Sequence, residues 1–139
     1  MLIYHIPTGA WTHEDGSPLL DANGVAVVGW AGNNSNPLNP NGIKGKNNPA
    51  MCGVRCIGPL PTGDYTIGPW QAQHGKLGPM VAELIPDASN DMHGRSGFFI
   101  HGAASGALHG QESEGCTVLE HTPRQAVKDS GDTRLRVVA

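Results

Sequence analysis

The chain has 139 residues, the size of one ordinary domain, and we expect residues 1–139 to form a single one. Its 20 glycines and 11 prolines are nearly twice the average share, which argues against a helical bundle and favours short strands joined by many turns. The net charge of −3 offers no basic surface for nucleic acid, and no apolar run approaches the ~18 residues of a membrane span. A mainly β domain is therefore expected, one that neither binds nucleic acid nor inserts into a membrane.

Strands are predicted along most of the chain, because β-branched and aromatic residues recur in short runs between turn residues. The predicted strands cover residues 2–6, 11–16, 25–30, 65–67, 81–85, 98–100 and 135–138. The run VAVVGW at 25–30 is continuously apolar and predicts a buried strand. Pro86 is expected to end the strand at 81–85.

One short helix is predicted near residues 122–130. Thr122 is a suitable N-cap residue, and Pro123 would occupy the first helical position, where its missing N–H has no cost. Gly131 then follows the last helical residue, as is common at helix ends.

Residues 31–50 form an Asn-, Gly- and Pro-rich segment with seven asparagines. Such a segment cannot build a core, so we expect a long surface loop. It is either a functional lid or binding surface, with amide groups for a polar ligand, or a tolerated insertion.

The residues that carry reactive chemistry lie between Phe98 and Leu119. A predicted strand ends in His101, and Cys116 begins the next apolar run, so the two side chains would be neighbours if these strands pair. A thiol, an imidazole base and the close backbone approach that Gly115 permits are the parts of a nucleophilic cysteine site.

Other roles for the cysteines and histidines remain open from residue types alone. His93, His101, His109 and Cys116 could bind a metal, although their spacing matches no compact zinc pattern, and we expect no metal and no cofactor. Three cysteines allow at most one disulfide within the chain, which could join Cys52 to Cys56, and Cys116 could simply fill the core.

Five ordered motifs resemble those of L,D-transpeptidase (YkuD-like) catalytic domains, and specifically the type VI secretion effectors with L,D-transpeptidase/L,D-carboxypeptidase activity. The motifs are Asn47–Met51, Gly58–Ile67, Gly94–Phe98, His101-Gly102 and Ser113–Cys116. The chain departs from many L,D-transpeptidases at Glu114, where histidine is usual, and at Val118, where arginine or asparagine is common.

The resemblance implies a YkuD-like β-sandwich in which Cys116 is the nucleophile and His101 the base, with His109 as the reserve candidate. An imidazolium beside Cys116 would lower the pKa of its thiol. The backbone around Ser113, Glu114 and Gly115 would supply the oxyanion donors and orient the turn.

The implied substrate is a peptidoglycan stem peptide. The resemblance implies that the bond between meso-diaminopimelate and D-Ala is cleaved through a thioester on the cysteine, and that the terminal D-Ala is either released or exchanged for another D-amino acid. Arg95, Gly102 and His109 are tentative substrate-binding residues. Trp11, Trp30 and Trp70 are expected in the core or partly buried rather than as a sugar platform.

The N-terminal residues contain no recognisable Sec signal, so we expect synthesis in the cytoplasm and secretion by another route. The resemblance implies action in the periplasm of a target bacterium, a carrier on the secretion apparatus and a cognate immunity protein. The alternatives are a non-catalytic peptidoglycan-binding module, a structural protein of a phage or secretion particle, and an ordinary cysteine peptidase.

Overall fold

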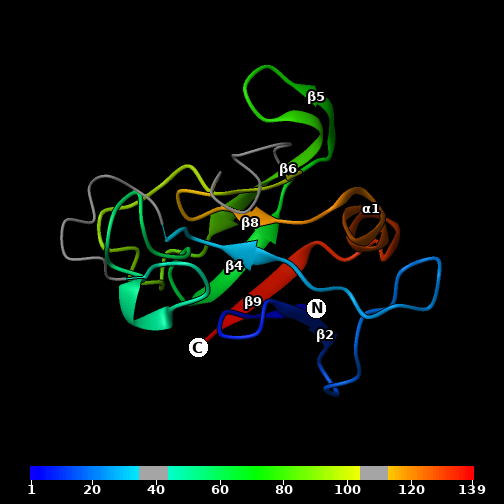
Figure 1. The fold of residues 1–139 in the computed structure, drawn as a ribbon, viewed down its shortest axis with the longest axis horizontal. Coiled ribbons are helices and arrows are strands. Elements are labelled where there is room, and N and C mark those ends of the chain that lie inside the picture. Colours follow the sequence, from blue (N-terminus) through cyan, green and yellow to red (C-terminus); the bar gives the residue numbers. More distant parts are fainter. Residues whose placement is uncertain (35–43, 104–112) are drawn as a thin grey trace.

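The computed structural model describes residues 1–34, 44–103 and 113–139 and is mostly β, with one short α-helix in that part of the chain (Figure 1). The strands are β1 Leu2–His5, β2 Ala10–His13, β3 Trp30–Ala31, β4 Gly63–Ile67, β5 Gln71–His74, β6 Gly78–Pro86, β7 Phe99–His101, β8 Thr117–Val118 and β9 Arg134–Val138. The helices are the 3₁₀ turn η1 Pro49–Met51 and α1 His121–Asp129. No helix in the described ranges has the length and apolar character to cross a membrane.

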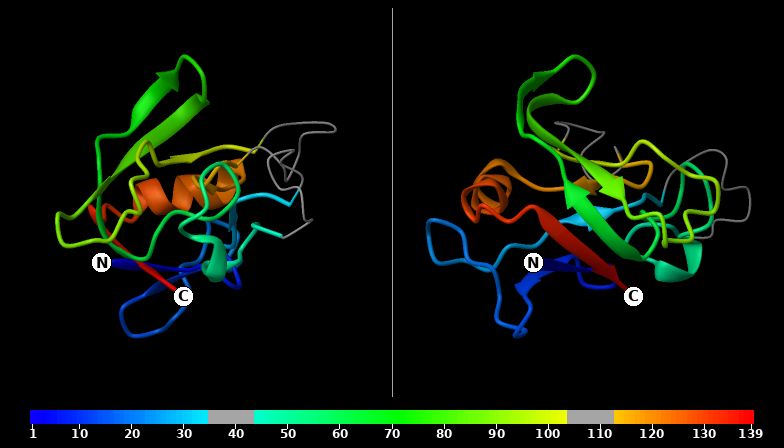
Figure 2. Two further views of the ribbon diagram at one scale, coloured as in Figure 1. Left: turned by 90° about the vertical axis from the view of Figure 1, so that its left-hand side faces the viewer. Right: turned by 180° about the vertical axis from the view of Figure 1, so that it is seen from behind.

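The described strands form one curled sheet in the order β2-β1-β9-β4-β6-β7-β8-β3, with β5 pairing to β6 outside this path. Two neighbouring pairs are parallel, β1 with β9 and β7 with β8, and the other pairs are antiparallel. The β5–β6 hairpin extends away from the rest of the sheet (Figure 2). Parallel pairing of β1 with β9 places the first and last strands of the chain side by side, next to the β2 edge of the sheet.

The core lies against one face of this sheet, where strand alternation supplies buried side chains. In β1, Leu2 and Tyr4 are fully buried while the residues between them are partly exposed. The ring of Tyr4 contacts that of Trp11 with centroids 5.4 Å apart, and Val127 packs α1 onto the same cluster. Each large apolar side chain buried in this way contributes roughly 1.5–3 kcal/mol of transfer free energy.

The prediction of a buried strand at 25–30 was wrong. Val27 is buried, but Val25 and Val28 are 58% and 50% exposed, and among the described residues, 25–29 make only isolated β-bridges. The side chains on its other face are exposed, so a continuously apolar run here does not indicate burial on both faces. A regular strand, β3, begins only at Trp30, the last residue of the run; it is two residues long and pairs with β8.

Two further features differ from the sequence-based expectations. The hairpin strand β5 was not predicted, because QAQH has no apolar alternation and is mostly exposed. The helix begins at His121 with Glu120 as N-cap and no side-chain cap hydrogen bond, so Thr122 is not the capping residue. Pro86 closes β6 as its last residue.

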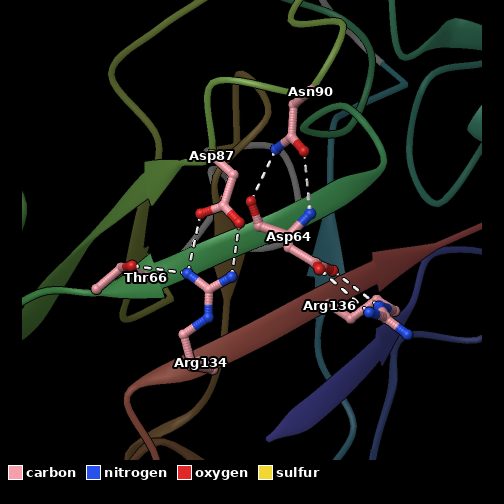
Figure 3. Close-up of polar contacts among 6 residues, drawn as sticks. All are labelled: Asp64, Thr66, Asp87, Asn90, Arg134 and Arg136. Atoms are coloured by element: carbon pink, nitrogen blue, oxygen red, sulfur yellow. Dashed lines mark hydrogen bonds and ion pairs between the residues drawn. The ribbon is translucent and has the colours of Figure 1, made fainter.

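A network of ion pairs and hydrogen bonds ties β9 to β4 and to the turn after β6 (Figure 3). Its members are Asp64, Thr66, Asp87, Asn90, Arg134 and Arg136. Arg134 donates to both carboxylate oxygens of Asp87 at 2.9 and 2.6 Å, and Arg136 does the same to Asp64 at 2.8 and 3.1 Å. These arginine hydrogen bonds hold the pKa values of Asp64 and Asp87 below their usual range.

We predict that Asp87→Asn lowers the thermal midpoint at neutral pH and that this loss disappears in acid. Because the pKa of Asp87 is lowered in the folded protein, its stabilisation is complete above the unfolded value of about 3.9 and is lost as the pH falls through the folded value. Glu83→Gln, at an exposed carboxylate with no ion pair in the described residues, is the matched control. A difference between wild type and Asp87→Asn that is independent of pH would contradict the ion-pair explanation.

Candidate active site

The candidate site lies where β7 and β8 run side by side. Their parallel register pairs Ile100 with Thr117 and His101 with Val118, and the Leu119 N–H donates to the His101 carbonyl at 3.0 Å. Cys116, one residue before β8, is therefore level with Phe99 and two positions from His101. Because side chains alternate along strands, Cys116 and His101 lie on the same face.

Both side chains line one cavity of about 440 Å³. Residues 94–99 form the wall that leads into β7, and the segment after η1 contributes Arg55 and Cys56. The β5–β6 turn contributes His74, Lys76 and Leu77, and Glu114 completes the lining. The cavity thus gathers segments that are distant in sequence around the predicted nucleophile and base.

Cys116 is partly exposed, and its sulfur has two backbone neighbours. The Phe99 N–H donates to Sγ at 3.3 Å, and Sγ lies 3.8 Å from the Gly97 carbonyl oxygen. Burial raises the pKa of the Cys116 thiol, while hydrogen bonds from the backbone N–H groups of Phe99 and of Cys116 itself act in the opposite direction. Burial therefore favours the neutral thiol over the thiolate that a neighbouring imidazolium was expected to favour.

His101 is 5% exposed and its ring is oriented by its own backbone neighbour. Nδ1 lies 2.9 Å from the Gly102 carbonyl oxygen, which can only accept a hydrogen bond. This contact favours the tautomer with the proton on Nδ1, which leaves Nε2 as the basic nitrogen. Gly102 thus supplies the orienting acceptor that the sequence could not identify. His109, the reserve base, lies outside the described residues.

Ser113 orients the turn before Cys116. Its fully buried hydroxyl accepts hydrogen bonds from the N–H groups of Gly32 and Gly115 at 3.0 and 3.1 Å and donates to the Cys116 carbonyl at 2.7 Å. The Gly115 N–H, one of the predicted oxyanion donors, is engaged in this way by the Ser113 hydroxyl. Asn33, which sequence reasoning missed, adds a 2.6 Å hydrogen bond to the Ser113 carbonyl.

Gly115 is required by close packing. Its φ of +132° is unfavourable for other residues, and a Cβ there would lie 2.6 Å from both Arg95 Nη2 and Phe98 Cε1. The turn can therefore approach the Arg95 guanidinium only without a side chain at this position.

Arg95 lines the cavity, but its guanidinium donates hydrogen bonds to backbone carbonyl groups. The terminal nitrogens donate to the carbonyls of Cys52 and Pro59 at 2.6 Å each and of Gly58 and Glu114 at 3.0 Å each. Four N–H groups thus meet four acceptors, and burial lowers the pKa of the guanidinium. These contacts give Arg95 a positioning role, and its tentative role in substrate binding remains a prediction.

Arg124, on α1, was missed because it reads as an exposed helix residue. It is 5% exposed, its Nη1 donates to the Leu119 carbonyl at 2.7 Å, and its Nε has no partner in the described residues. A Cβ on Gly102 would lie 2.6 Å from Nη1, so Gly102 allows the helix to pack against the end of β7. The tentative role of Gly102 in substrate binding remains a prediction.

The other reactive groups are placed as follows. Cys52, Cys56 and Cys116 are free thiols, so the disulfide considered from the sequence is not formed. Within residues 1–34, 44–103 and 113–139, no three His, Cys, Asp or Glu side chains gather as a metal site. Trp11 is buried in the core, and Trp30 and Trp70 are partly buried outside the cavity lining.

Comparisons with known proteins agree with this fold. The family described as "Tlde1 domain" matches residues 42–139. An L,D-transpeptidase from Mycobacterium tuberculosis H37Rv superposes with a TM-score of 0.54 at 16% sequence identity, over 99% of this chain and 57% of that one. The present chain therefore spans little more than half the length of that protein, and the likeness concerns the fold. The curated proteins compared with the chain gave no match.

We predict that the alkylation rate of Cys116 in the ligand-free protein keeps rising through pH values above about 8.5, the ordinary thiol range. Burial raises the thiol pKa, so the reactive thiolate accumulates only at higher pH. Iodoacetamide labelling at a series of pH values, with the modified peptide assigned by mass spectrometry, measures this profile, and a short unstructured cysteine peptide is the reference. A rate that is already level at neutral pH would show a preformed thiolate instead.

Proposed function

The chain belongs to the Tlde1 domain family of type VI secretion L,D-transpeptidase effectors, and from this premise we propose that it is a cysteine enzyme that modifies peptidoglycan stem peptides. The observation that carries the proposal is that Cys116 and His101 line one cavity from adjacent parallel strands. The proposed substrate is a tetrapeptide stem, and the scissile bond joins meso-diaminopimelate to the terminal D-Ala.

In the first half of the reaction, Cys116 Sγ attacks the carbonyl carbon of meso-diaminopimelate. The thiol proton passes to Nε2 of His101 as the C–S bond forms, while Nδ1–H stays on the Gly102 carbonyl. The C–N bond then breaks, and the departing D-Ala amine takes the proton from His101. The product is a thioester on Cys116.

In the second half, a nucleophile opens the thioester with the same base. Water gives a tripeptide stem, which is L,D-carboxypeptidase activity, and the amine of a D-amino acid gives an exchanged stem, which is L,D-transpeptidase activity. His101 removes the proton of the incoming nucleophile and returns it to the departing sulfur. In each step His101 accepts and returns one proton, so no other acid or base is needed.

Backbone N–H groups at Glu114 and Cys116 are the proposed donors to the tetrahedral oxyanion. The Ser113 hydroxyl supports this assignment because it fixes the turn from both sides. The loss of one such donor typically costs ~10²–10³ in rate.

A peptidoglycan substrate also implies the compartment in which the protein acts and the proteins with which it interacts. The proposal places its activity in the periplasm of a target bacterium, delivered through a carrier of the secretion apparatus. A cognate immunity protein would protect the producing cells. Expression directed to the periplasm should then be toxic, while the same chain kept in the cytoplasm should be harmless.

Product analysis tests the reaction directly. The full chain is incubated with a purified tetrapeptide muropeptide, with and without an added D-amino acid, and the products are separated by mass. We predict release of D-Ala, loss of at least about 10³-fold in rate for Cys116→Ala and for His101→Ala, and little change for Cys56→Ser in the same cavity. Thermal midpoints check that each variant is folded.

The outcomes separate the proposal from its alternatives. Unchanged D-Ala release by Cys116→Ala would exclude the thioester mechanism. Muropeptide binding with no change in mass would indicate a non-catalytic wall-binding module, and absence of binding would favour a structural protein. Cleavage of ordinary L,L-peptides would identify a general cysteine peptidase.

A further inference from the structure

Two cations in the cavity wall have side chains that nothing else in the described residues engages. Arg55 lies in the segment after η1 and Lys76 in the β5–β6 turn, and both line the cavity that contains Cys116. Both residues are exposed, and neither makes an ion pair or a side-chain hydrogen bond within the described ranges. Arg95 differs from them, because its terminal nitrogens are occupied by backbone carbonyls.

The backbone that carries Lys76 is anchored beside the site. His74 Nδ1 accepts hydrogen bonds from the N–H groups of Lys76 and Leu77 at 3.2 and 3.1 Å. The His74 ring also contacts the ring of Phe99, with centroids 5.3 Å apart. Since Phe99 is level with Cys116 in the sheet, these contacts tie the hairpin turn to the position of the nucleophile.

The segment that carries Arg55 is anchored from the other direction. The Gly58 N–H donates to the Val54 carbonyl at 3.0 Å, and Arg95 binds the carbonyls of Cys52 and Gly58 on either side. The Arg55 backbone is therefore held by the same guanidinium that packs under Gly115.

The charge of this wall contrasts with that of the whole chain. The protein has a net charge of −3, but among the described residues that line the cavity Arg55, Lys76 and Arg95 stand against one carboxylate, that of Glu114. A positively charged cavity attracts negatively charged ligands and raises their local concentration, even when the protein as a whole is negatively charged.

We propose that Arg55 and Lys76 form a carboxylate-binding subsite beside Cys116, which selects peptide substrates with free carboxylates. The planar guanidinium of Arg55 suits a carboxylate in two-point contact, and the ammonium of Lys76 adds a mobile point charge. The inference rests on the proposed function and moves substrate recognition from Arg95 to these two residues. Orientation of the stem by its carboxylates would place the scissile carbonyl near Sγ.

The first test uses Cys116 as its own reporter and needs no turnover. Iodoacetate and iodoacetamide differ by a carboxylate and a neutral amide, so the ratio of their alkylation rates at Cys116 cancels any change in the thiol itself. We expect this ratio to fall about 5- to 10-fold in the double variant Arg55→Gln/Lys76→Gln, within the range of electrostatic focusing. Lys128→Gln on α1, outside the cavity lining, removes one positive charge away from the cavity and should leave the ratio unchanged.

The second test measures binding without thiol reactivity. The full chain carrying Cys116→Ala is titrated calorimetrically with the tetrapeptide stem, with the same stem amidated at its carboxylates, and with inorganic phosphate. We expect about 10-fold tighter binding of the acid form, a preference that the substitutions at Arg55 and Lys76 abolish. Equal affinity for the two stems, an unchanged preference in the double variant, or phosphate binding as tight as the stem would each overturn the subsite.

These measurements distinguish failure of the subsite from failure of the proposed function. A preference for the acid form without D-Ala release would support the subsite and contradict the proposed enzymatic function. D-Ala release that depends on Cys116 but not on Arg55 or Lys76 keeps the enzyme and rejects the subsite.

Discussion

The guanidinium of Arg95 is the contact on which the site depends. It joins three carbonyls of the segment 52–59 to the Glu114 carbonyl, so two stretches far apart in sequence become one wall of the cavity. Hydrogen bonds to a charged donor contribute roughly 1.5–3 kcal/mol each, and loss of the donor would leave these carbonyls unpaired. The close approach also explains Gly115, since any Cβ there would meet Nη2. Through these backbone contacts Arg95 shapes the cavity wall next to Cys116.

The chemistry proposed for this place follows from the strand pair beside it. Parallel pairing of β7 with β8 puts Cys116 and His101 on one face, and the Gly102 carbonyl sets the ring so that Nε2 is the basic nitrogen. Burial favours the neutral form of the Cys116 thiol. The β5–β6 hairpin and the segment after η1 add cations at the rim of the same cavity. Cys116, His101 and the two exposed cations therefore line the same cavity.

Much of this arrangement could be predicted from local patterns in the sequence. The apolar runs around residues 98–100 and 117–119 predicted neighbouring strands, and their pairing is confirmed. The polar strand β5 carries no such pattern, and the segment 25–30 is apolar although much of it is exposed. The contacts of Arg95 and Asn33 join residues distant in sequence, and no local signal distinguishes the buried Arg124 from an exposed helix residue. Sequence motifs could identify the reactive groups, while the network that positions them required the three-dimensional structure.

The most direct test of cysteine catalysis is to trap the covalent intermediate. The full chain is mixed with tetrapeptide muropeptide, quenched in acid, digested, and analysed by mass spectrometry. If Cys116 is the nucleophile, the peptide that contains it will carry the stem without its terminal D-Ala, and hydroxylamine will remove this adduct as expected for a thioester. Release of D-Ala with the Cys116 peptide unmodified at every time point, or with the adduct on Cys56 instead, would contradict the mechanism.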